Sequence, residues 1–432
     1  MVFSAPTMLR ICPSGWANEN IDDHNLLVEI ITEGVKRLSE DANKRLKSSK
    51  FNIDVLFNAY TEKDVGNFIK DNGSFGFGKL YADSGGLQIV TAGMTIDDSL
   101  KSNIYATQSI ADYAMCFDEI PCITVSSSGG KGNRAQTTNK LYIPSRKLET
   151  ALKTANNIKE QIEILSGYND KTNVHYIVQG NTYQDMVDWV IAGCGVLEKD
   201  HFDRIGGLAL AGTCMGNGTL ESVDMLVAYH NLNNILGPEK IKKHIHLLGF
   251  GSVSRLVPAI YLSRSGFIKD DVTISFDSSS YSMSYYMGRF NDINGKLLTG
   301  PQGLKKIFHE VYQYFGDIYE KYIPNLNEEE FLIHVLSQSR SVADTLNNEP
   351  DGLRGLSRAN IALSCLWQVL GFVEQLNKLI DYSEYDNTGL GRLQQITNMA
   401  DYHNWLSEFG KYIPSKRIAR EKSVDVCNFF QD

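Results

Sequence analysis

The sequence of 432 residues lacks the features that mark membrane and secreted proteins. No apolar run approaches the ~20 residues that a membrane-spanning helix needs. The first ten residues have neither the basic nor the apolar region of a secretory signal peptide. We therefore expect a cytoplasmic protein, in the host cytoplasm if a phage encodes it, with no membrane partner.

Cysteine and positive charge are also scarce. The seven cysteines are widely scattered and none forms a C-x-x-C pair, which argues against a disulfide framework and a zinc knot. We expect neither a metal nor a cofactor. The net charge of −9 argues against indiscriminate coating of nucleic acid, but it is compatible with a local basic groove.

What the chain does contain is an alternation of short β-rich runs and amphipathic helical runs. Expected strands lie at residues 7–12, 53–57, 79–82, 113–117, 174–178, 205–210, 245–249 and 272–276. Expected helices lie at residues 22–46, 97–111, 184–192, 220–230 and 252–263, and from Ser145 onward behind a serine cap. Because no G-x-G-x-x-G follows an early strand, the alternation predicts an α/β fold of the (β/α)8 TIM-barrel type over residues 1–300.

Two segments depart from this alternation. Residues 126–140 are rich in glycine and serine and carry Lys131 and Arg134, which indicates a long loop inserted after the fourth strand. A solvated loop and a phosphate-binding lid are both compatible with that composition. Residues 301–432 have helical spacing, with a stripe of tyrosine and phenylalanine, and we expect an appended C-terminal helical domain.

Polar residues recur where the expected strands end. Asp83 ends the third strand and is followed by Ser84, Gly85 and Gly86. A lone D-S-G-G segment would indicate only a turn cap. Further polar residues follow at the equivalent ends of other strands: Asp118, Gln179 and Asp277. Because all strand ends of a barrel converge on one face, we expect three carboxylates and an amide to line one active site.

The ordered set D-S-G-G-x-Q, F-D-E, I-V-Q-G, G-G-L-A and F-D over residues 75–280 resembles the guanine transglycosylase superfamily. These barrel enzymes exchange guanine for a 7-deazaguanine base in nucleic acid. The resemblance implies that Asp277 is the nucleophile, that Asp83 handles protons and that Asp118 reads the guanine edge. It also implies base contacts from Gln179, Gly206, Gly207 and Leu208, and we expect the turn at Ser84 and Gly85 to lie against the flat ligand.

The chemistry of base exchange supports these roles. Breaking and remaking a bond between C1′ and a ring nitrogen passes through an oxocarbenium-like state that a carboxylate can trap covalently. A second carboxylate is needed to move the proton of the base. A third can accept the adjacent N1–H and amino donors of guanine. The base must also leave the stack before it can be reached.

The chain departs from the tRNA-modifying members of this superfamily after the nucleophile. There it has Ser278, Ser279 and Ser280 in place of P-T-R, and only Cys365 and Cys427 follow, so the C-x-C-x-x-C…H zinc site of those members is lacking. We therefore expect the divergent phage and bacterial branch, which inserts a free 7-deazaguanine such as 7-cyano-7-deazaguanine into DNA. A tRNA substrate, hydrolytic base excision, a non-catalytic nucleic-acid-binding subunit and a homodimer remain open.

Nucleic-acid contacts are expected from local basic residues. The candidates are Lys131 and Arg134 in the inserted loop, Arg255 after the glycine turn that follows the seventh strand, and Arg289 beyond the nucleophile. A glycine turn that opens a helix can hold phosphate through its backbone N–H groups. Arg255 and Arg289 could equally pair with neighbouring carboxylates.

Overall fold

A computed structural model of the chain describes most of its residues. The described residues are 8–13, 25–46, 50–61, 67, 70–71, 76–86, 96–126, 138–180, 183–211, 221–237, 244–250, 253–268, 272–278, 289–322, 327–329, 363–378, 380 and 390–409. None of the helices in these ranges is long and apolar enough to cross a membrane.

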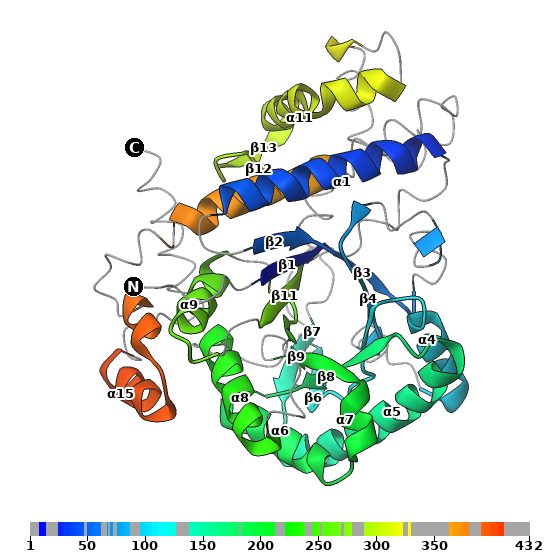
Figure 1. Ribbon diagram of the computed structural model, residues 1–432, viewed down its shortest axis with the longest axis vertical. Helices are drawn as coiled ribbons and strands as arrows, with labels where there is room; N and C mark the ends of the chain where they lie inside the picture. Colours follow the sequence, from blue (N-terminus) through cyan, green and yellow to red (C-terminus); the bar gives the residue numbers. More distant parts are fainter. Residues whose placement is uncertain are drawn as a thin grey trace.

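The centre of the molecule is a curled parallel sheet (Figure 1). Within the described residues it has nine strands, and the pairs between neighbours run parallel. In sheet order they are β2 (Lys50–Ile53), β1 (Met8–Pro13), β11 (Thr273–Ser278), β10 (His244–Leu247), β9 (Ile205–Leu210), β8 (Asn173–Val178), β5 (Tyr113–Met115), β4 (Leu80–Asp83) and β3 (Val55–Asn58). The α/β fold is therefore a half-barrel that is compatible with a TIM-type barrel.

The two outermost strands of this sheet follow each other in the chain. Only Asp54 separates β2 from β3, yet β2 pairs with β1 and β3 pairs with β4. The sheet therefore curls far enough for its first and last strands to meet at one residue. Asp54 is fully buried at this point.

Helices cover the outer face of the curled sheet, as parallel strands require (Figure 1). They are α4 (Asp98–Gln108), α5 (Lys147–Tyr168), α6 (Tyr183–Cys194), α7 (Lys199–Arg204), α8 (Glu221–Leu236) and α9 (Val253–Arg264). Each presents an apolar face to the strands. In α5 the buried residues include Ala151, Ala155, Ile158 and Leu165.

Details of α5 differ from the sequence-based expectation. Pro144 opens a short 3₁₀ turn, η3 (Pro144–Arg146), so α5 begins at Lys147 and Ser145 does not cap it. The helix consequently starts later than expected, and the side chain of Leu148 is exposed rather than buried. A proline fixes φ and favours such a tight first turn, which explains why the serine signal was misleading.

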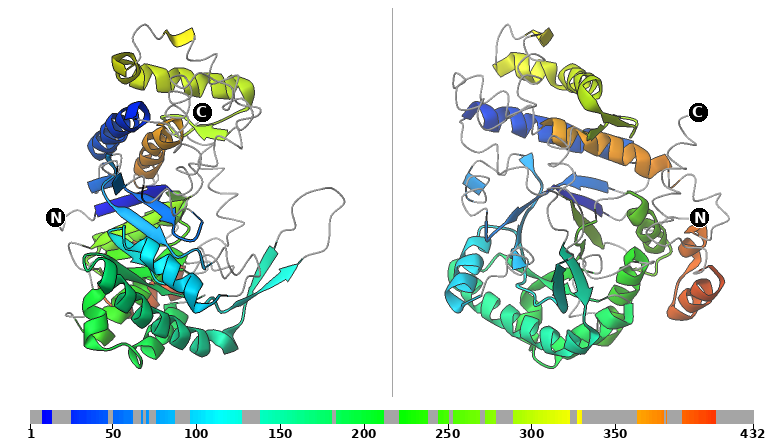
Figure 2. Two further views of the ribbon diagram at one scale, coloured as in Figure 1. Left: turned by 90° about the vertical axis from the view of Figure 1, so that its right-hand side faces the viewer. Right: turned by 180° about the vertical axis from the view of Figure 1, so that it is seen from behind.

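A separate antiparallel ribbon leaves the curled sheet after β5. It pairs β6 (Cys122–Ser126) with β7 (Thr138–Tyr142) and stands out from the body of the molecule (Figure 2). The inserted loop that we expected at residues 126–140 is therefore shorter, because both of its flanks are strands. Threonine, valine, isoleucine and tyrosine in these flanks favour extended backbone.

The C-terminal part contains a hairpin and helices. The hairpin β12 (Arg289–Asn291) and β13 (Leu297–Thr299) leads into α11 (Gly300–Tyr322). Helical residues 363–378, the 3₁₀ turn η5 (Leu390–Gln395) and α15 (Met399–Phe409) follow. A domain boundary at residue 300 stays a prediction.

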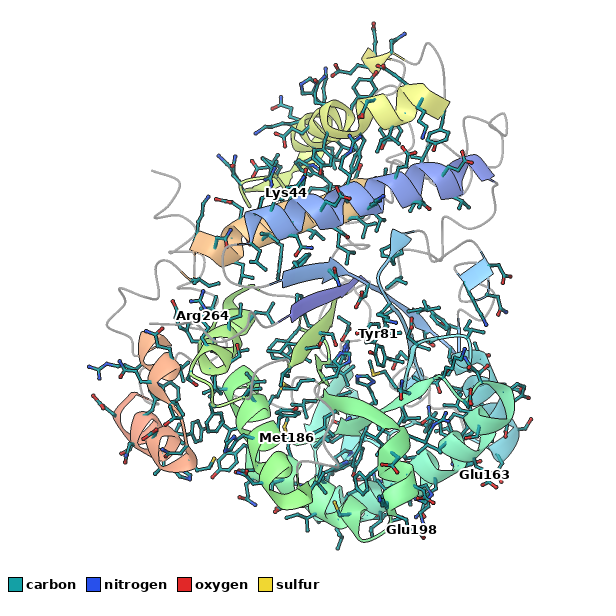
Figure 3. All side chains as sticks on the ribbon, viewed as in Figure 1. Lys44, Tyr81, Glu163, Met186, Glu198 and Arg264 are labelled. Carbon is teal, nitrogen blue, oxygen red and sulfur yellow. The ribbon has the colours of Figure 1, made fainter. Side chains whose placement is uncertain are left out.

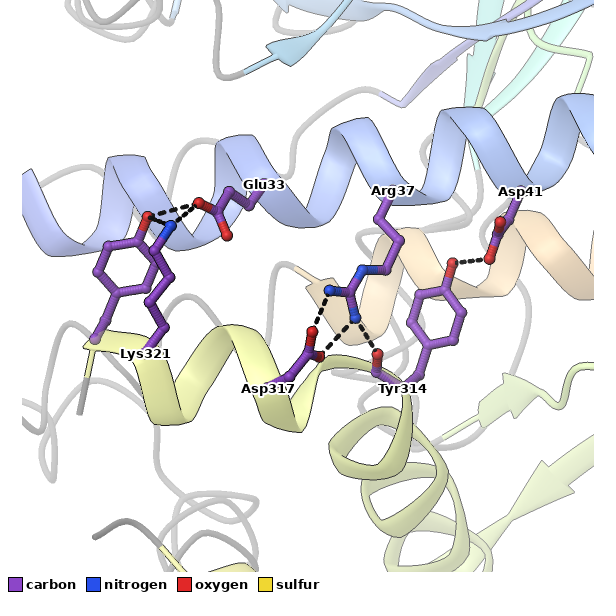
Figure 4. Close-up of polar contacts among 7 residues, drawn as sticks. Glu33, Arg37, Asp41, Tyr314, Asp317 and Lys321 are labelled. Atoms are coloured by element: carbon purple, nitrogen blue, oxygen red, sulfur yellow. Dashed lines mark hydrogen bonds and ion pairs between the residues drawn. The ribbon is translucent and has the colours of Figure 1, made fainter. Parts of the chain in front are cut away.

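The long helix α1 (Asn25–Arg45) connects the two parts, because α11 lies along it. Arg37 donates two hydrogen bonds to the carboxylate of Asp317, and Lys321 pairs with Glu33 (Figure 4). The hydroxyl of Tyr314 donates to Asp41 at 2.6 Å. Buried side chains of α1, α11 and the barrel belong to one hydrophobic cluster.

Candidate active site

Asp83 is the last residue of β4, as the sequence predicted. A sharp turn follows, in which Gly85 has a φ of 73°. A Cβ atom at Gly85 would lie 2.7 Å from the side-chain oxygen of Asn58, which itself accepts hydrogen bonds from the backbone N–H groups of Tyr60 and Thr61. Only glycine fits this turn, and the turn places the Asp83 carboxylate at the carboxyl edge of the sheet.

The Asp83 carboxyl is poised to exchange protons near neutral pH. Burial, with smaller contributions from the negative charges of Asp118 and Asp277, raises its pKa to about 7. The backbone N–H groups of Ser84 and Gly85 act in the opposite direction, because they hydrogen-bond the charged form. The effect of both other aspartates agrees with the expectation that the three carboxylates lie near one another, and a Cβ at Gly86 would lie 3.6 Å from Oδ1 of Asp118.

Asp118 follows β5 and is buried. Its segment is held to α5 by two hydrogen bonds: Asn157 donates to the carbonyl of Phe117 at 3.0 Å, and the N–H of Glu119 donates to Thr154 at 2.9 Å. The side-chain amide of Gln179 donates to Oδ2 of Asp118. The sequence correctly placed these two side chains together.

Gln179 also offers an unused acceptor. Its Oε1 is buried, and no hydrogen bond joins it to another described group. A buried amide oxygen without a donor is costly, so its presence indicates a ligand or water that supplies an N–H or O–H. Next to the Asp118 carboxylate, it suits a ligand that carries several donors.

Asp277 lies in β11, two residues from Ser275 on the same face of the strand. One of its oxygens is fixed: the backbone N–H of Gly249 donates to Oδ1 at 2.7 Å, and Nε2 of His246 lies 3.3 Å from the same atom. Gly249 has a φ of 71°, which turns its N–H toward the carboxylate. Among the described residues, no partner hydrogen-bonds Oδ2.

Beneath the carboxylates lies a layer of aromatic rings and histidines inside the curl of the sheet. Tyr81 marks this layer in Figure 3. The rings of His175 and His244 meet edge to face at 4.4 Å between centroids. Burial, with a smaller effect of His246, holds the pKa of His175 well below its usual range, so this imidazole is neutral.

Sequence reasoning missed His244, His246 and Ser275. A signal was present, because two histidines at alternate positions of one strand point to the same side of a sheet. Strands were predicted at 245–249 and 272–276, which include His246 and Ser275 but not His244, and no role was assigned to these side chains. The histidines form the polar floor of the site.

Gly206, Gly207 and Leu208 lie inside β9 rather than at its carboxyl end, Leu210. Gly207 is in register with His175, four residues before Gln179, and a Cβ at Gly207 would lie 2.8 Å from Nε2 of His175. A Cβ at Gly206 would instead meet the side chain of Asn173. A contact of these residues with a base stays a prediction.

The predicted nucleic-acid contacts are only partly described. Lys131 and Arg134 lie outside the described residues. Arg255 is in α9 and Arg289 is the first residue of β12, but the structure describes only the backbone of both. Their role in nucleic-acid binding stays a prediction.

The described residues contain no group of three histidine, cysteine or acidic side chains that could hold a metal ion. Cys116 and Cys365 are buried free thiols, and Cys194 is a partly buried one. Burial raises the pKa of the Cys116 thiol well above its usual range, which makes this thiol a poor nucleophile.

Comparisons with known proteins give no match. No protein-family model matches the chain. A search of curated proteins also finds no similar sequence.

Proposed function

We propose that the protein is a base-exchange enzyme of the guanine transglycosylase type that replaces guanine in DNA by a free 7-deazaguanine. The observation that carries this proposal is the grouping of Asp83, Asp118 and Asp277 at one edge of the sheet, with the pKa of Asp83 at about 7. Each carboxylate has a different environment, so each is suited to a different task. The resemblance of the ordered sequence segments supports the same reaction.

In the first step, Oδ2 of Asp277 attacks C1′ of the target nucleoside. The bond between C1′ and the base nitrogen breaks, and its electron pair leaves with the base. The hydrogen bonds to Oδ1 hold the carboxylate so that the other oxygen faces the substrate. In the second step the ring nitrogen of the incoming base attacks C1′, and Asp277 leaves as a carboxylate.

Asp83 is the proton carrier of this scheme. With a pKa of about 7, it is present in both protonation states at neutral pH. It gives a proton to the departing base and takes one from the incoming base, so it returns to its starting state after one exchange.

Asp118 and Gln179 are suited to the recognition of the base. Guanine and its 7-deaza analogues carry N1–H and an exocyclic amine side by side, and the Asp118 carboxylate accepts such donors. The unpartnered Oε1 of Gln179 supplies a further acceptor nearby. Adenine has no N1–H, which favours guanine-type bases at this site.

DNA is the substrate that we propose, and the ribbon of β6 and β7 supports it. Its 21 residues, 122–142, contain Lys131, Arg134 and Lys140 and no acidic residue, in a chain whose net charge is −9. The ribbon starts four residues after Asp118. A two-stranded ribbon has dimensions that fit the major groove of a duplex.

The curled sheet supports the finer architecture that this superfamily implies. We place β2 and β3 as two halves of one strand, broken at Asp54, which closes the sheet into a (β/α)8 barrel. The proposed active site then has the position usual for such barrels, at the carboxyl ends of the strands. A cytoplasmic site of action fits a substrate of DNA.

The decisive experiment supplies labelled guanine or 7-cyano-7-deazaguanine together with either duplex DNA or tRNA. We expect the polymer fraction to gain label with DNA and not with tRNA. Label in tRNA would replace the proposed substrate, and release of free guanine without incorporation would indicate hydrolysis. No reaction with either polymer, in a correctly folded preparation, would indicate a non-catalytic binding subunit.

A further inference from the structure

A continuous chain of hydrogen bonds leads from Asp277 into the interior of the sheet. Nε2 of His246 lies 3.3 Å from Oδ1 of Asp277, and Nδ1 of His246 lies 2.7 Å from Oγ of Ser275. The same hydroxyl is 2.7 Å from Nε2 of His244, which is 3.3 Å from the hydroxyl of Tyr81. His246 and Ser275 are fully buried, and His244 nearly so.

The donors of this chain run in one direction when Asp277 is ionised. A carboxylate accepts only, so a neutral His246 ring has its proton on Nε2 and an acceptor at Nδ1. Ser275 then donates its single proton to Nδ1 of His246, and its oxygen accepts from Nε2–H of His244. Because Nε2 of His244 then carries its proton, it does not accept from the Tyr81 hydroxyl, and the directed bonds begin at His244. These three donors point toward Asp277 and stabilise negative charge on that carboxylate.

The arrangement of Ser275, His246 and Asp277 differs from a serine nucleophile with its base. Ser275 is fully buried, whereas the Asp277 side chain is 18% exposed. The group that can meet a substrate is therefore the carboxylate. His246 hydrogen-bonds this carboxylate from the buried side, and Ser275 hydrogen-bonds His246.

We propose that His246, extended by Ser275 and His244, is a positioning residue that fixes Asp277 and stabilises it as a leaving group. This inference rests on the proposed function, because it assigns the role of the histidine chain in that reaction. Gly249 holds Oδ1 from the backbone, so the side-chain contribution comes from His246.

These hydrogen bonds act most strongly on the second step of the exchange. In the covalent intermediate Oδ2 is bonded to C1′, and Oδ1 becomes the carbonyl oxygen of an ester. An ester carbonyl is a weaker acceptor than a carboxylate, so the bond from His246 strengthens as the electron pair returns to Asp277. Loss of His246 should therefore slow release more than attack.

The test compares His246→Leu with His246→Gln. Leucine removes both ring nitrogens, and we expect turnover to fall about 10- to 100-fold, the value of a hydrogen bond to a charged group. The fraction of protein trapped as a covalent adduct with DNA should rise. Glutamine retains an N–H donor and should restore part of the turnover.

His175→Leu is the matched control. His175 is another fully buried histidine of the same layer, and no hydrogen bond to a described group satisfies its ring nitrogens. Thermal melting of all three variants checks the fold. The proposal is overturned if His246→Leu and His175→Leu lose turnover equally, or if adduct and turnover fall together in His246→Leu.

A second measurement does not depend on activity. In ¹⁵N-histidine NMR spectra of the whole protein, His246 should have its proton on Nε2, and Asp277→Ala should shift this signal and that of His244 but not that of His175. Unchanged signals of His246 would contradict the hydrogen bond between His246 and Asp277. If the signals respond and base exchange is nevertheless absent, the proposed function fails and the positioning of Asp277 stands.

Discussion

Carboxyl groups in two acidic clusters of this molecule have pKa values that are shifted in opposite directions. At the helix interface, Lys321 holds the pKa of Glu33 below its usual range, and Arg37 does the same for Asp317. At the carboxyl edge of the sheet, burial and, to a smaller extent, the charges of Asp118 and Asp277 raise the pKa of Asp83 to about 7. Paired charges join helices, whereas burial beside like charges prepares a carboxyl group for proton transfer.

The two clusters also differ in their effect on the free energy of unfolding. Among the described residues, neither Asp83 nor Asp277 forms an ion pair with lysine or arginine. Burial of such charges lowers the free energy of unfolding, and the rest of the fold must offset that cost. Mutations in the two clusters should therefore have opposite effects on stability and very different effects on activity.

The largest effect is expected for Asp277→Asn. The amide keeps the shape of the side chain but removes the attacking charge, so base exchange should fall by at least ~10³-fold and no adduct should form. Denaturing gel electrophoresis of the protein with labelled DNA measures the adduct. Exchange near the wild-type rate would rule out Asp277 as the nucleophile.

Asp83→Asn should lower the turnover of the protein but raise its stability above neutral pH. Turnover should fall about 10²- to 10⁴-fold, because an amide cannot transfer the proton. A carboxyl whose pKa is raised on folding binds its proton more tightly in the folded state, so wild-type stability falls as the pH rises from about 4 to 7.

Removal of this group should make the variant more stable than the wild type, on the order of 4 kcal/mol at pH 8. The difference should vanish below pH ~4, where both states of the wild type are protonated. Urea denaturation at a series of pH values measures it. A variant that is less stable than the wild type at pH 8 would contradict the raised pKa.

Gly85→Ala tests whether the turn positions Asp83. The left-handed backbone and the 2.7 Å approach to Asn58 should together cost about 2 kcal/mol of stability and reduce turnover. Gly237→Ala is the control, since Gly237 has a φ of 77° but no atom lies within 4 Å of its Cβ position. Equal losses in stability and activity for both variants would show that crowding against Asn58 is unimportant.

The smallest effect is expected at the helix interface. Arg37→Ala removes the two bonds to Asp317 and one to the carbonyl of Tyr314, but the Asp317 side chain is 68% exposed. Exposed pairs contribute about 1 kcal/mol or less, and the effect should disappear as acid protonates Asp317. Base exchange should be unchanged, and a loss of exchange would contradict the separation of the two clusters.

Sequence periodicity was sufficient to find the strands of the curled sheet except β2, but it missed β6, β7, β12 and β13. Asp83 and Gln179 were placed correctly because a polar residue at the end of a buried parallel strand lies at the carboxyl edge of the sheet. The shared site of Asp83, Asp118 and Asp277 follows from the same rule, and the pKa of Asp83 reflects it.

Other features depend on how neighbouring strands of the curled sheet are aligned, which a linear pattern does not contain. Gly206 and Gly207 were expected inside the strand at 205–210, but the packing of Gly207 against His175 follows only from the register of β9 on β8. The hydrogen bonds of His246 required knowledge that β10 and β11 are neighbours. The spacing of residues along a strand shows on which face of the sheet each side chain lies. It does not show which residue of the neighbouring strand lies beside it.

The position of α1 has a consequence for how the chain unfolds. This helix precedes β2 in sequence, and Asn377 donates a hydrogen bond at 2.8 Å to the carbonyl of Arg45 at its end. A Cβ at Gly34 would collide with the side chain of Leu363, so the two helices are in close contact. Removal of the C-terminal helices would therefore uncover α1, and we expect the curled sheet and these helices to melt in a single cooperative transition.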